Sequence, residues 1–234
     1  MIAKIIGTFH VMCNESVSYI IEQEVLKMKD LLQRQDTTIV FETMDVNGVP
    51  LMDGVVFDVM TRINNNVVAL DDSNKDELRA FCNYIANAEY EIVKPFFSRI
   101  GITNGTDYFQ TQMGKLINNK GMINHALRNF LNQGSYNKAE SDAFIANIMY
   151  SLTENYQEEI IACGMTQEEY NTIEAKIQAD AHKLEELGKE FHNTITRREG
   201  NWNLPDSEVV IIVAGFSHKE ELERIYSERG YEII

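Results

Sequence analysis

The sequence predicts an α/β fold with a mainly parallel central sheet, flanked by helices and carrying a helical insertion in the middle of the chain. At both ends of the 234-residue chain, short β-rich runs alternate with segments of helical apolar spacing. The middle shows no strand pattern. Alternating strands and helices are typical of parallel sheets, because each parallel connection needs a crossover segment. We therefore expect a single α/β domain over 1–234, with the insertion at 89–165.

The first part of the chain contains three short apolar runs of strand length. These expected strands are Ile2 to Gly7, Thr37 to Phe41 and Asn66 to Leu70. Apolar residues at helical spacing lie near each run and predict the flanking helices. The expected helices are Ser16 to Leu32, Val55 to Ile63, and a third that runs from a capping-box-like start at Ser73 to about Asn87.

The C-terminal part repeats this alternation. The run Glu208 to Ala214 (EVVIIVA) is the strongest buried-strand signal in the chain. Ser217 and Glu220 have the spacing of a capping box, which predicts a helix from there to about Glu228. A glycine then ends that helix, and Tyr231 to Ile234 has the pattern of a last edge strand.

The middle of the chain is expected to be helical. Its sequence leaves open whether the insertion at 89–165 is a lid or an oligomer contact. The segment 166–196 is predicted to be one long helix, with a capping box formed by Thr166 and Glu169 at its start. Such a helix would span roughly 46 Å, long enough to cross a whole domain.

Composition and charge exclude several classes of partner. The chain has 36 acidic and 21 basic residues, a formal net charge of −15. A surface of this charge repels phosphate backbones and anionic lipids, so we expect neither nucleic acid nor a membrane as a partner. No signal-peptide pattern is present, and three scattered cysteines fit a reducing compartment. We expect a cytoplasmic protein that acts on a small molecule or a peptide, with a homo-oligomer left open.

Polar residues follow directly after the expected strands. They are Gly7-Thr8-Phe9-His10 after the first, Glu42 after the second, Asp71 and Asp72 after the third, and Gly215-Phe216-Ser217-His218 after the fourth. In an open parallel sheet, ligands bind beyond the carboxyl ends of the strands. We therefore expect His10, Glu42 and His218 to converge at one edge of the sheet. Gly7 and Gly215 would let the backbone approach a ligand or cofactor.

Each of these residues also has a simpler structural interpretation. The two Gly-x-x-His segments could be ordinary strand-to-helix turns, and Asp71 and Asp72 could cap the helix that follows them. His218 lies at an expected helix start, whose positive end favours a neutral imidazole. A neutral imidazole is the form that ligates metals or accepts a proton.

Further candidates lie outside the strand ends. Arg197 and Arg198 close the expected long helix, where they complement its negative end or clamp an anion near the site. Cys13 permits a nucleophile or a soft metal ligand, although a small buried apolar side chain is the commoner role of a lone cysteine. The remaining histidines are expected to be solvated; they are His125, His182 and His192.

Several of these motifs together resemble the TraB/Tiki superfamily, which includes erythromycin-esterase-like and ChaN-like proteins. The motifs are GTFH, VFETM, VVALDD, TRREGNW and the C-terminal VVIIVAGFSHKEELERIYSERGYEII. The resemblance covers about Ile2 to Asn87 and Arg197 to Ile234. It implies an α/β fold with a helical insertion and a site at the strand ends.

Position by position, the resemblance implies a defined set of site residues. They are Gly7 and His10, Glu42, Arg198 (Arg197 if the register slips by one), and Gly215 with His218. The acidic residue after the third strand is usually glutamate in the superfamily, whereas this chain has Asp71 or Asp72 there.

The expected function is hydrolysis of an amide or ester bond at this His/Glu site. In one mechanism, His10, Glu42 and His218 ligate a divalent metal ion, which activates water. In the other, no metal is used: a histidine held by Glu42 is the general base, and Arg198 stabilises the oxyanion. The alternatives are a haem- or metal-binding ChaN-like protein and a catalytically inert interaction module on the same fold.

Overall fold

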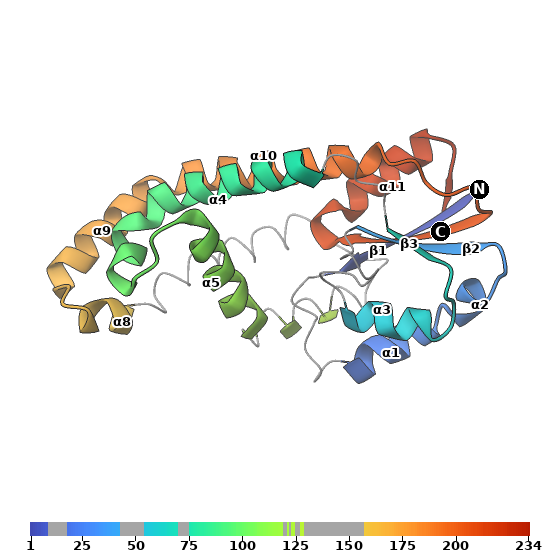
Figure 1. Cartoon of the computed structure of the whole chain (residues 1–234), viewed down its shortest axis with the longest axis horizontal. Helices are drawn as coiled ribbons and strands as arrows, with labels where there is room; N and C mark the ends of the chain where they lie inside the picture. Colours follow the sequence, from blue (N-terminus) through green and yellow to red (C-terminus); the bar gives the residue numbers. More distant parts are fainter. Residues whose placement is uncertain are drawn as a thin grey trace. The chain divides into compact units, whose positions relative to one another are not determined.

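The computed structural model describes residues 1–8, 18–42, 54–69, 75–118, 121, 123–124, 127–128 and 157–234 (Figure 1). The described residues fall into two compact units. The sheet unit takes its residues from Met1–Asp72, Ile117–Lys138 and Ile195–Ile234. The helical unit takes its residues from Ser73–Leu116 and Ala139–Thr194.

The sheet unit contains, among the described residues, one sheet of five strands that are all parallel. In chain order the strands are β1 (Ile2–Thr8), β2 (Thr37–Phe41), β3 (Val67–Ala69), β4 (Val209–Gly215) and β5 (Glu232–Ile233). Their order in the sheet is β3-β2-β4-β1-β5. The predicted α/β fold with a mainly parallel central sheet is therefore confirmed.

The central strand β4 pairs with β1 and β2 so that all three strands begin at the same position along the sheet. Val209, its first residue, pairs with Ile2 of β1 and with Thr37 of β2. Every residue of β4 is buried, as its continuous apolar sequence predicts for a strand covered on both faces. Because the three strands begin level and run in the same direction, their carboxyl ends lie at the same edge of the sheet.

Helices cover the sheet on opposite sides (Figure 1). On one side, α11 (Lys219–Glu228) contacts β1 and β5, and its Leu222 and Tyr226 join a core with Ile5 and Ile212. On the other side lie α1 (Ser18–Leu26) and α3 (Gly54–Thr61), which contact each other. The single helix expected at the start is interrupted, because Lys27 and Met28 separate α1 from the short α2 (Lys29–Leu32).

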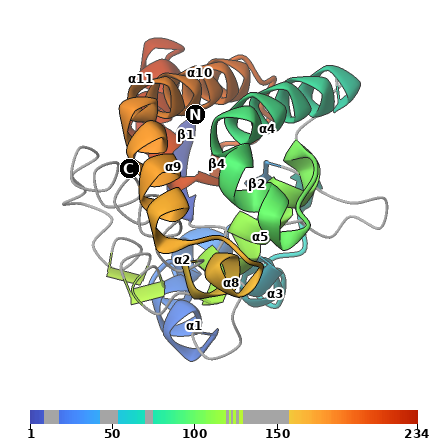
Figure 2. The same cartoon turned by 90° about the vertical axis from the view of Figure 1, so that its left-hand side faces the viewer.

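The helical unit is built around an aromatic core. Its described elements are α4 (Lys75–Phe97), the 3₁₀ turn η3 (Ser98–Ile100), α5 (Gly105–Asn118), α8 (Gln157–Ala162), α9 (Gln167–Ala179) and the first part of α10 (Ala181–Gly200). Contacts join α9 to α4 and to α8 (Figure 2). Phe97 packs edge-on to Tyr108 with ring centroids 5.0 Å apart, and the Tyr90 hydroxyl donates to the Ile102 carbonyl over 2.8 Å.

A glycine allows two helices of this unit to approach closely. A Cβ atom at Gly105 would lie 2.5 Å from the Asn87 backbone nitrogen, so only glycine fits at the start of α5. The Gly105 amide also donates to the Asn87 side chain over 3.1 Å. Asn87 lies within α4. The helix continues through Pro95 to Phe97, so the end expected near Asn87 is wrong.

The long helix expected over 166–196 is two helices in the structure. Its predicted capping box is present, with Thr166 and Glu169 bonded to each other in both directions. The interruption is one residue, Asp180, whose φ of −92° and ψ of 2° leave the helical region. Aspartate is a weak helix former because its carboxylate competes for local hydrogen bonds, and here it pairs with Lys183.

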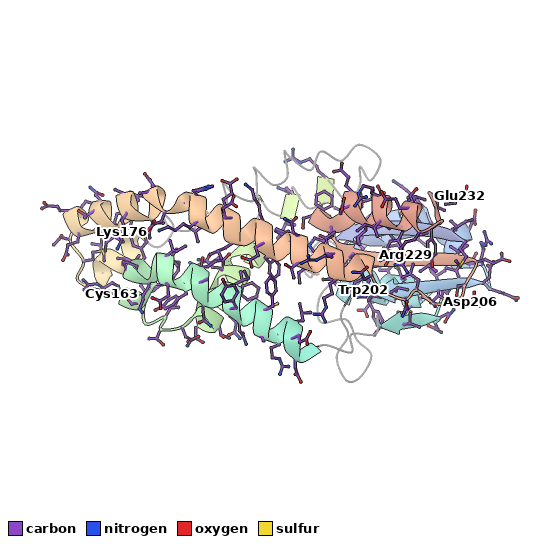
Figure 3. The ribbon with its side chains drawn as sticks, turned by 90° about the horizontal axis from the view of Figure 1, so that it is seen from above. Cys163, Lys176, Trp202, Asp206, Arg229 and Glu232 are labelled. Atoms are coloured by element: carbon purple, nitrogen blue, oxygen red, sulfur yellow. The ribbon has the colours of Figure 1, made fainter. Side chains whose placement is uncertain are left out.

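The second helix also extends beyond its expected end. Helix α10 continues from Thr196 to Gly200, and its last residues from Ile195 onward belong to the sheet unit. Trp202, labelled in Figure 3, follows this end and packs against the core beneath α11. Within the part of the chain that the structure describes, no helix has the length and apolar character of a membrane span.

The burial of Glu89 on α4 can be tested through the pH dependence of unfolding. Burial raises the pKa of its carboxyl to about 7. The protonated form therefore stabilises the fold below about pH 4.5, and this contribution is lost as the pH rises through 7. We expect Glu89→Gln to be more stable than the wild type at pH 8 by about 1–3 kcal/mol, and the gain to shrink toward pH 5. Urea unfolding across this range measures the difference.

The exposed Glu190 on α10 provides the control for this test. Glu190→Gln replaces an exposed side chain and should change the free energy of unfolding by no more than about 0.5 kcal/mol. A gain for Glu89→Gln that is equal at pH 5 and pH 8 would contradict the burial of a neutral carboxyl.

Candidate metal centre

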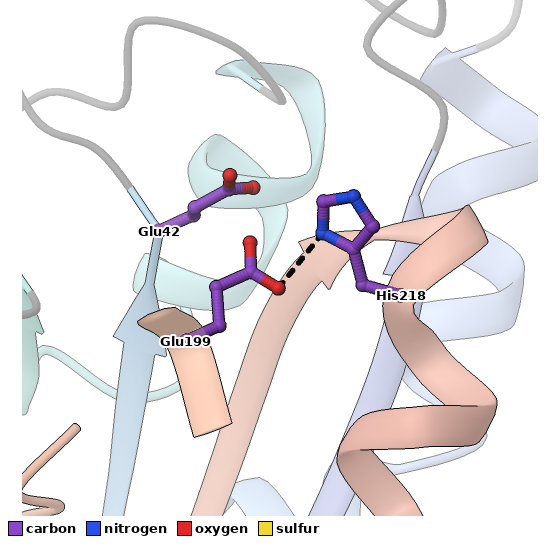
Figure 4. Close-up of side chains that lie close together, drawn as sticks. All are labelled: Glu42, Glu199 and His218. Carbon is purple, nitrogen blue, oxygen red and sulfur yellow. Dashed lines mark hydrogen bonds and ion pairs between the residues drawn. The ribbon is translucent and has the colours of Figure 1, made fainter. Parts of the chain in front are cut away.

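Three titratable side chains converge in the sheet unit (Figure 4). Glu42 follows β2, Glu199 lies in the last turn of α10, and His218 ends the 3₁₀ turn η4 (Phe216–His218), which joins β4 to α11. Each offers one ligand atom, and these three atoms lie within 4.8 Å of one another.

The group lies at the carboxyl edge of the sheet. β2 and β4 are neighbours, and Phe41, the residue before Glu42, pairs with Val213 of β4. The end of β1 is joined to the same edge, because the Thr8 hydroxyl donates to the Ala214 carbonyl over 3.2 Å. Ligands of open parallel sheets bind at this edge, so the position of the group agrees with a functional site.

The group is acidic, and two of its three side chains are buried. Glu199 is 1% exposed and His218 is 4% exposed, while Glu42 is partly buried. Burying carboxylates is unfavourable unless a positive partner compensates their charge. Carboxylate oxygens with an imidazole nitrogen are a donor set for zinc and for first-row divalent ions such as manganese or iron. The three residues therefore fit a divalent metal ion in both charge and chemistry.

One hydrogen bond orients the imidazole. His218 Nδ1 lies 2.8 Å from Glu199 Oε2, and the dashed line in Figure 4 marks this hydrogen bond. A carboxylate at this distance favours a proton on Nδ1 and leaves the lone pair of Nε2 available for a metal or a proton. Glu199 can therefore act as a ligand itself or as the group that sets the tautomer of His218.

The turn before His218 differs from the capping box expected at Ser217 and Glu220. Helix α11 begins only at Lys219, His218 occupies its N-cap position, and no side-chain hydrogen bond caps it. The capping-box prediction is therefore wrong. Its physical reason is the 3₁₀ turn, which takes up Phe216 to His218 and brings the imidazole into the buried group.

The glycine of the first Gly-x-x-His segment has a packing role. A Cβ atom at Gly7 would lie 2.9 Å from Phe216 Cδ2 and 3.1 Å from Phe216 Cα. Gly7 therefore lets the turn that carries His218 lie against the end of β1. Gly215 is the buried last residue of β4, with extended backbone angles (φ −57°, ψ 135°).

The structure brings together Glu42 and His218 of the residues expected from the sequence. Arg198 is partly buried and Arg197 is exposed, both in the last turn of α10. The exposure expected for His182 and His192 is confirmed. The other expected residues lie outside the described part of the chain; they are His10, Cys13, Asp71, Asp72 and His125.

Glu199 is the residue that the sequence analysis missed. It follows the arginine pair and looks like part of a charged, solvated helix end. A signal was nevertheless present. The apolar positions of this helix include Phe191 and Ile195, and Glu199 occupies the next position, four residues on. A carboxylate that continues an apolar stripe indicates a buried polar group that needs a partner.

In comparisons with protein-family models, with curated proteins and with solved structures, nothing matches this chain.

Substitution of Gly7 tests the close contact between the end of β1 and the η4 turn that carries His218. Gly7→Ala should lower the free energy of unfolding by about 1–3 kcal/mol, because the added methyl group overlaps Phe216. Gly188→Ala on α10 is the control, because nothing lies within 4 Å of a Cβ atom there. That change should stabilise the helix by about 0.5–1 kcal/mol. If Gly7→Ala were as stable as the wild type, the close approach of the turn to β1 would be ruled out.

Proposed function

We propose that the protein is a divalent-metal-dependent hydrolase that cleaves an amide or ester bond at the Glu42–Glu199–His218 site. The observation that carries this proposal is the buried imidazole and two carboxylates within 4.8 Å of one another at the carboxyl edge of a parallel sheet. The motifs GTFH, VFETM and GFSHKEEL support membership of the TraB/Tiki superfamily, which we propose as the class of this protein.

Glu42, Glu199 and His218 would hold the ion. A bound divalent ion of this kind polarises a carbonyl oxygen and lowers the pKa of a coordinated water. His10 remains a further ligand predicted from the sequence, two residues after the end of β1. The burial of Glu199 and His218 removes competing water from the donor atoms and strengthens their electrostatic interactions.

The hydrogen bond between Glu199 and His218 supports a metal-free form of the same hydrolase. Glu199 holds Nδ1, so Nε2 of His218 can accept a proton from water while the water oxygen attacks the carbonyl carbon. The imidazolium then returns this proton to the leaving amine or alkoxide as the acyl bond breaks. Arg198, in the same helical turn as Glu199, is our candidate for stabilising the oxyanion.

Metal binding provides the test of this proposal. Protein purified without added metal should contain close to one divalent ion per chain by mass spectrometry, or should bind Mn²⁺ or Zn²⁺ in calorimetry. Glu42→Gln, Glu199→Gln and His218→Asn should each weaken binding at least about tenfold, because each removes a donor or its support. His182→Asn, at an exposed histidine, is the matched control and should bind like the wild type.

Hydrolysis of model esters and short peptides completes the test. Turnover that depends on His218 and on added metal supports the metal-dependent form. Turnover that depends on His218 but survives chelation supports the metal-free form. Absence of both metal binding and turnover would contradict a hydrolase. A Soret band that develops on haem titration and is lost in His218→Asn would favour the haem-binding alternative instead.

A further inference from the structure

We propose that α11 is a positioning element for the metal centre, and that Tyr226 holds the Glu199 carboxylate in place without touching it. This inference rests on the proposed function, because it assigns a role to residues behind the site. Tyr226 is the positioning residue, and Gly200 and Arg229 complete the arrangement.

The end of α10 accepts hydrogen bonds from two side chains, one in α11 and one just after it. The Tyr226 hydroxyl donates to the Glu199 carbonyl over 2.8 Å, and Arg229 Nη1 donates to the Gly200 carbonyl over 2.8 Å. The last carbonyls of a helix have no partner within the helix. Here Tyr226 of α11 and Arg229, the residue that follows α11, supply two donors, in addition to the Trp202 amide, which donates to the Glu199 carbonyl over 3.2 Å.

The two helices touch at a glycine. A Cβ atom at Gly200 would lie 2.6 Å from Ile225 Cδ1 and 3.0 Å from Ile225 Cγ2. An added methyl group at Gly200 would therefore require the Ile225 side chain or the end of α10 to shift. Ile225 lies in the last turn of α11, and Arg229 follows the helix as its C-cap residue. The steric contact and the Arg229 hydrogen bond thus act on the same residue, Gly200.

The Tyr226 side chain is closely packed. Its side chain is fully buried, its ring packs edge-on to Tyr231 at 5.6 Å, and the guanidinium of Arg229 lies 5.0 Å from its ring centroid. These contacts surround the ring whose hydroxyl donates to the Glu199 carbonyl.

The partner of Glu199 directly precedes α11. His218 is followed by Lys219, the first residue of α11. Tyr226, near the end of α11, and Arg229, just after it, donate hydrogen bonds to the end of α10. The separation of Glu199 Oε2 and His218 Nδ1, 2.8 Å, is therefore set by one helix acting at both ends. Metal ligands must be placed to within about 0.2 Å, so a small shift of the α10 end changes affinity.

Tyr226→Phe is the first experiment, because it removes only the hydroxyl. Calorimetry with Mn²⁺ or Zn²⁺ alone should show binding weaker than the wild type by roughly tenfold, the effect usual for a group behind a ligand. Circular dichroism should show an unchanged fold. Tyr231→Phe is the matched control: it removes a hydroxyl from the neighbouring ring, and its affinity should equal that of the wild type.

A steric pair provides the second experiment. Gly200→Ala should weaken metal binding through the overlap with Ile225, and Gly200→Ala/Ile225→Ala should restore most of it by removing the clashing atoms. A purely structural role would predict no such recovery, because the double variant loses core packing. Failure of the double variant to bind more tightly than Gly200→Ala would overturn the steric part of the proposal.

A metal-free measurement separates this inference from the proposed function. The ¹⁵N resonances of the His218 ring, assigned by their loss in His218→Asn, report the hydrogen bond to Glu199 directly. They should shift in Tyr226→Phe and stay in place in Tyr231→Phe. Unchanged His218 resonances in Tyr226→Phe would overturn the positioning role. If the two variants shift as expected but the wild type binds no metal, only the metal-dependent function is contradicted.

Discussion

The candidate centre depends on the register of three parallel strands, which begin at the same position along the sheet. Val209 pairs with both Ile2 and Thr37, so β1, β4 and β2 advance together and end at one edge. Glu42 and His218 meet because each follows one of these strands after few residues. A slip of one residue in either pairing would turn the side chains of that strand to the opposite face and separate the two groups.

The acidity of the centre makes its stability depend on what it holds. Glu42 and Glu199 supply two carboxylates, whereas the imidazole of His218 supplies at most one positive charge. A cation that binds only the folded chain adds to the stability of the fold, by about 2.7 kcal/mol at a concentration one hundred times its dissociation constant. Function and folding are therefore linked through the same three side chains.

Sequence reasoning worked where one local signal decided the structure. EVVIIVA is a buried strand because six apolar residues in succession suit no surface, and the strand-end rule then led to Glu42 and His218. It failed where packing decided. Gly105 lies against Asn87 in the middle of a longer helix, and the buried Glu199 lies where α10 ends against Tyr226 of α11. Such contacts join residues that no local pattern relates.

The position of β4 in the sheet has a consequence for how the chain folds during synthesis. The hydrogen bond from Thr8 to Ala214 spans 206 residues, and both β1 and β2 need β4 as their shared neighbour. Contacts of such long range form slowly. Until the ribosome has released β4, these two strands have unpaired edges of the kind that promote aggregation. The sheet is completed only after translation has passed β5, which ends at Ile233.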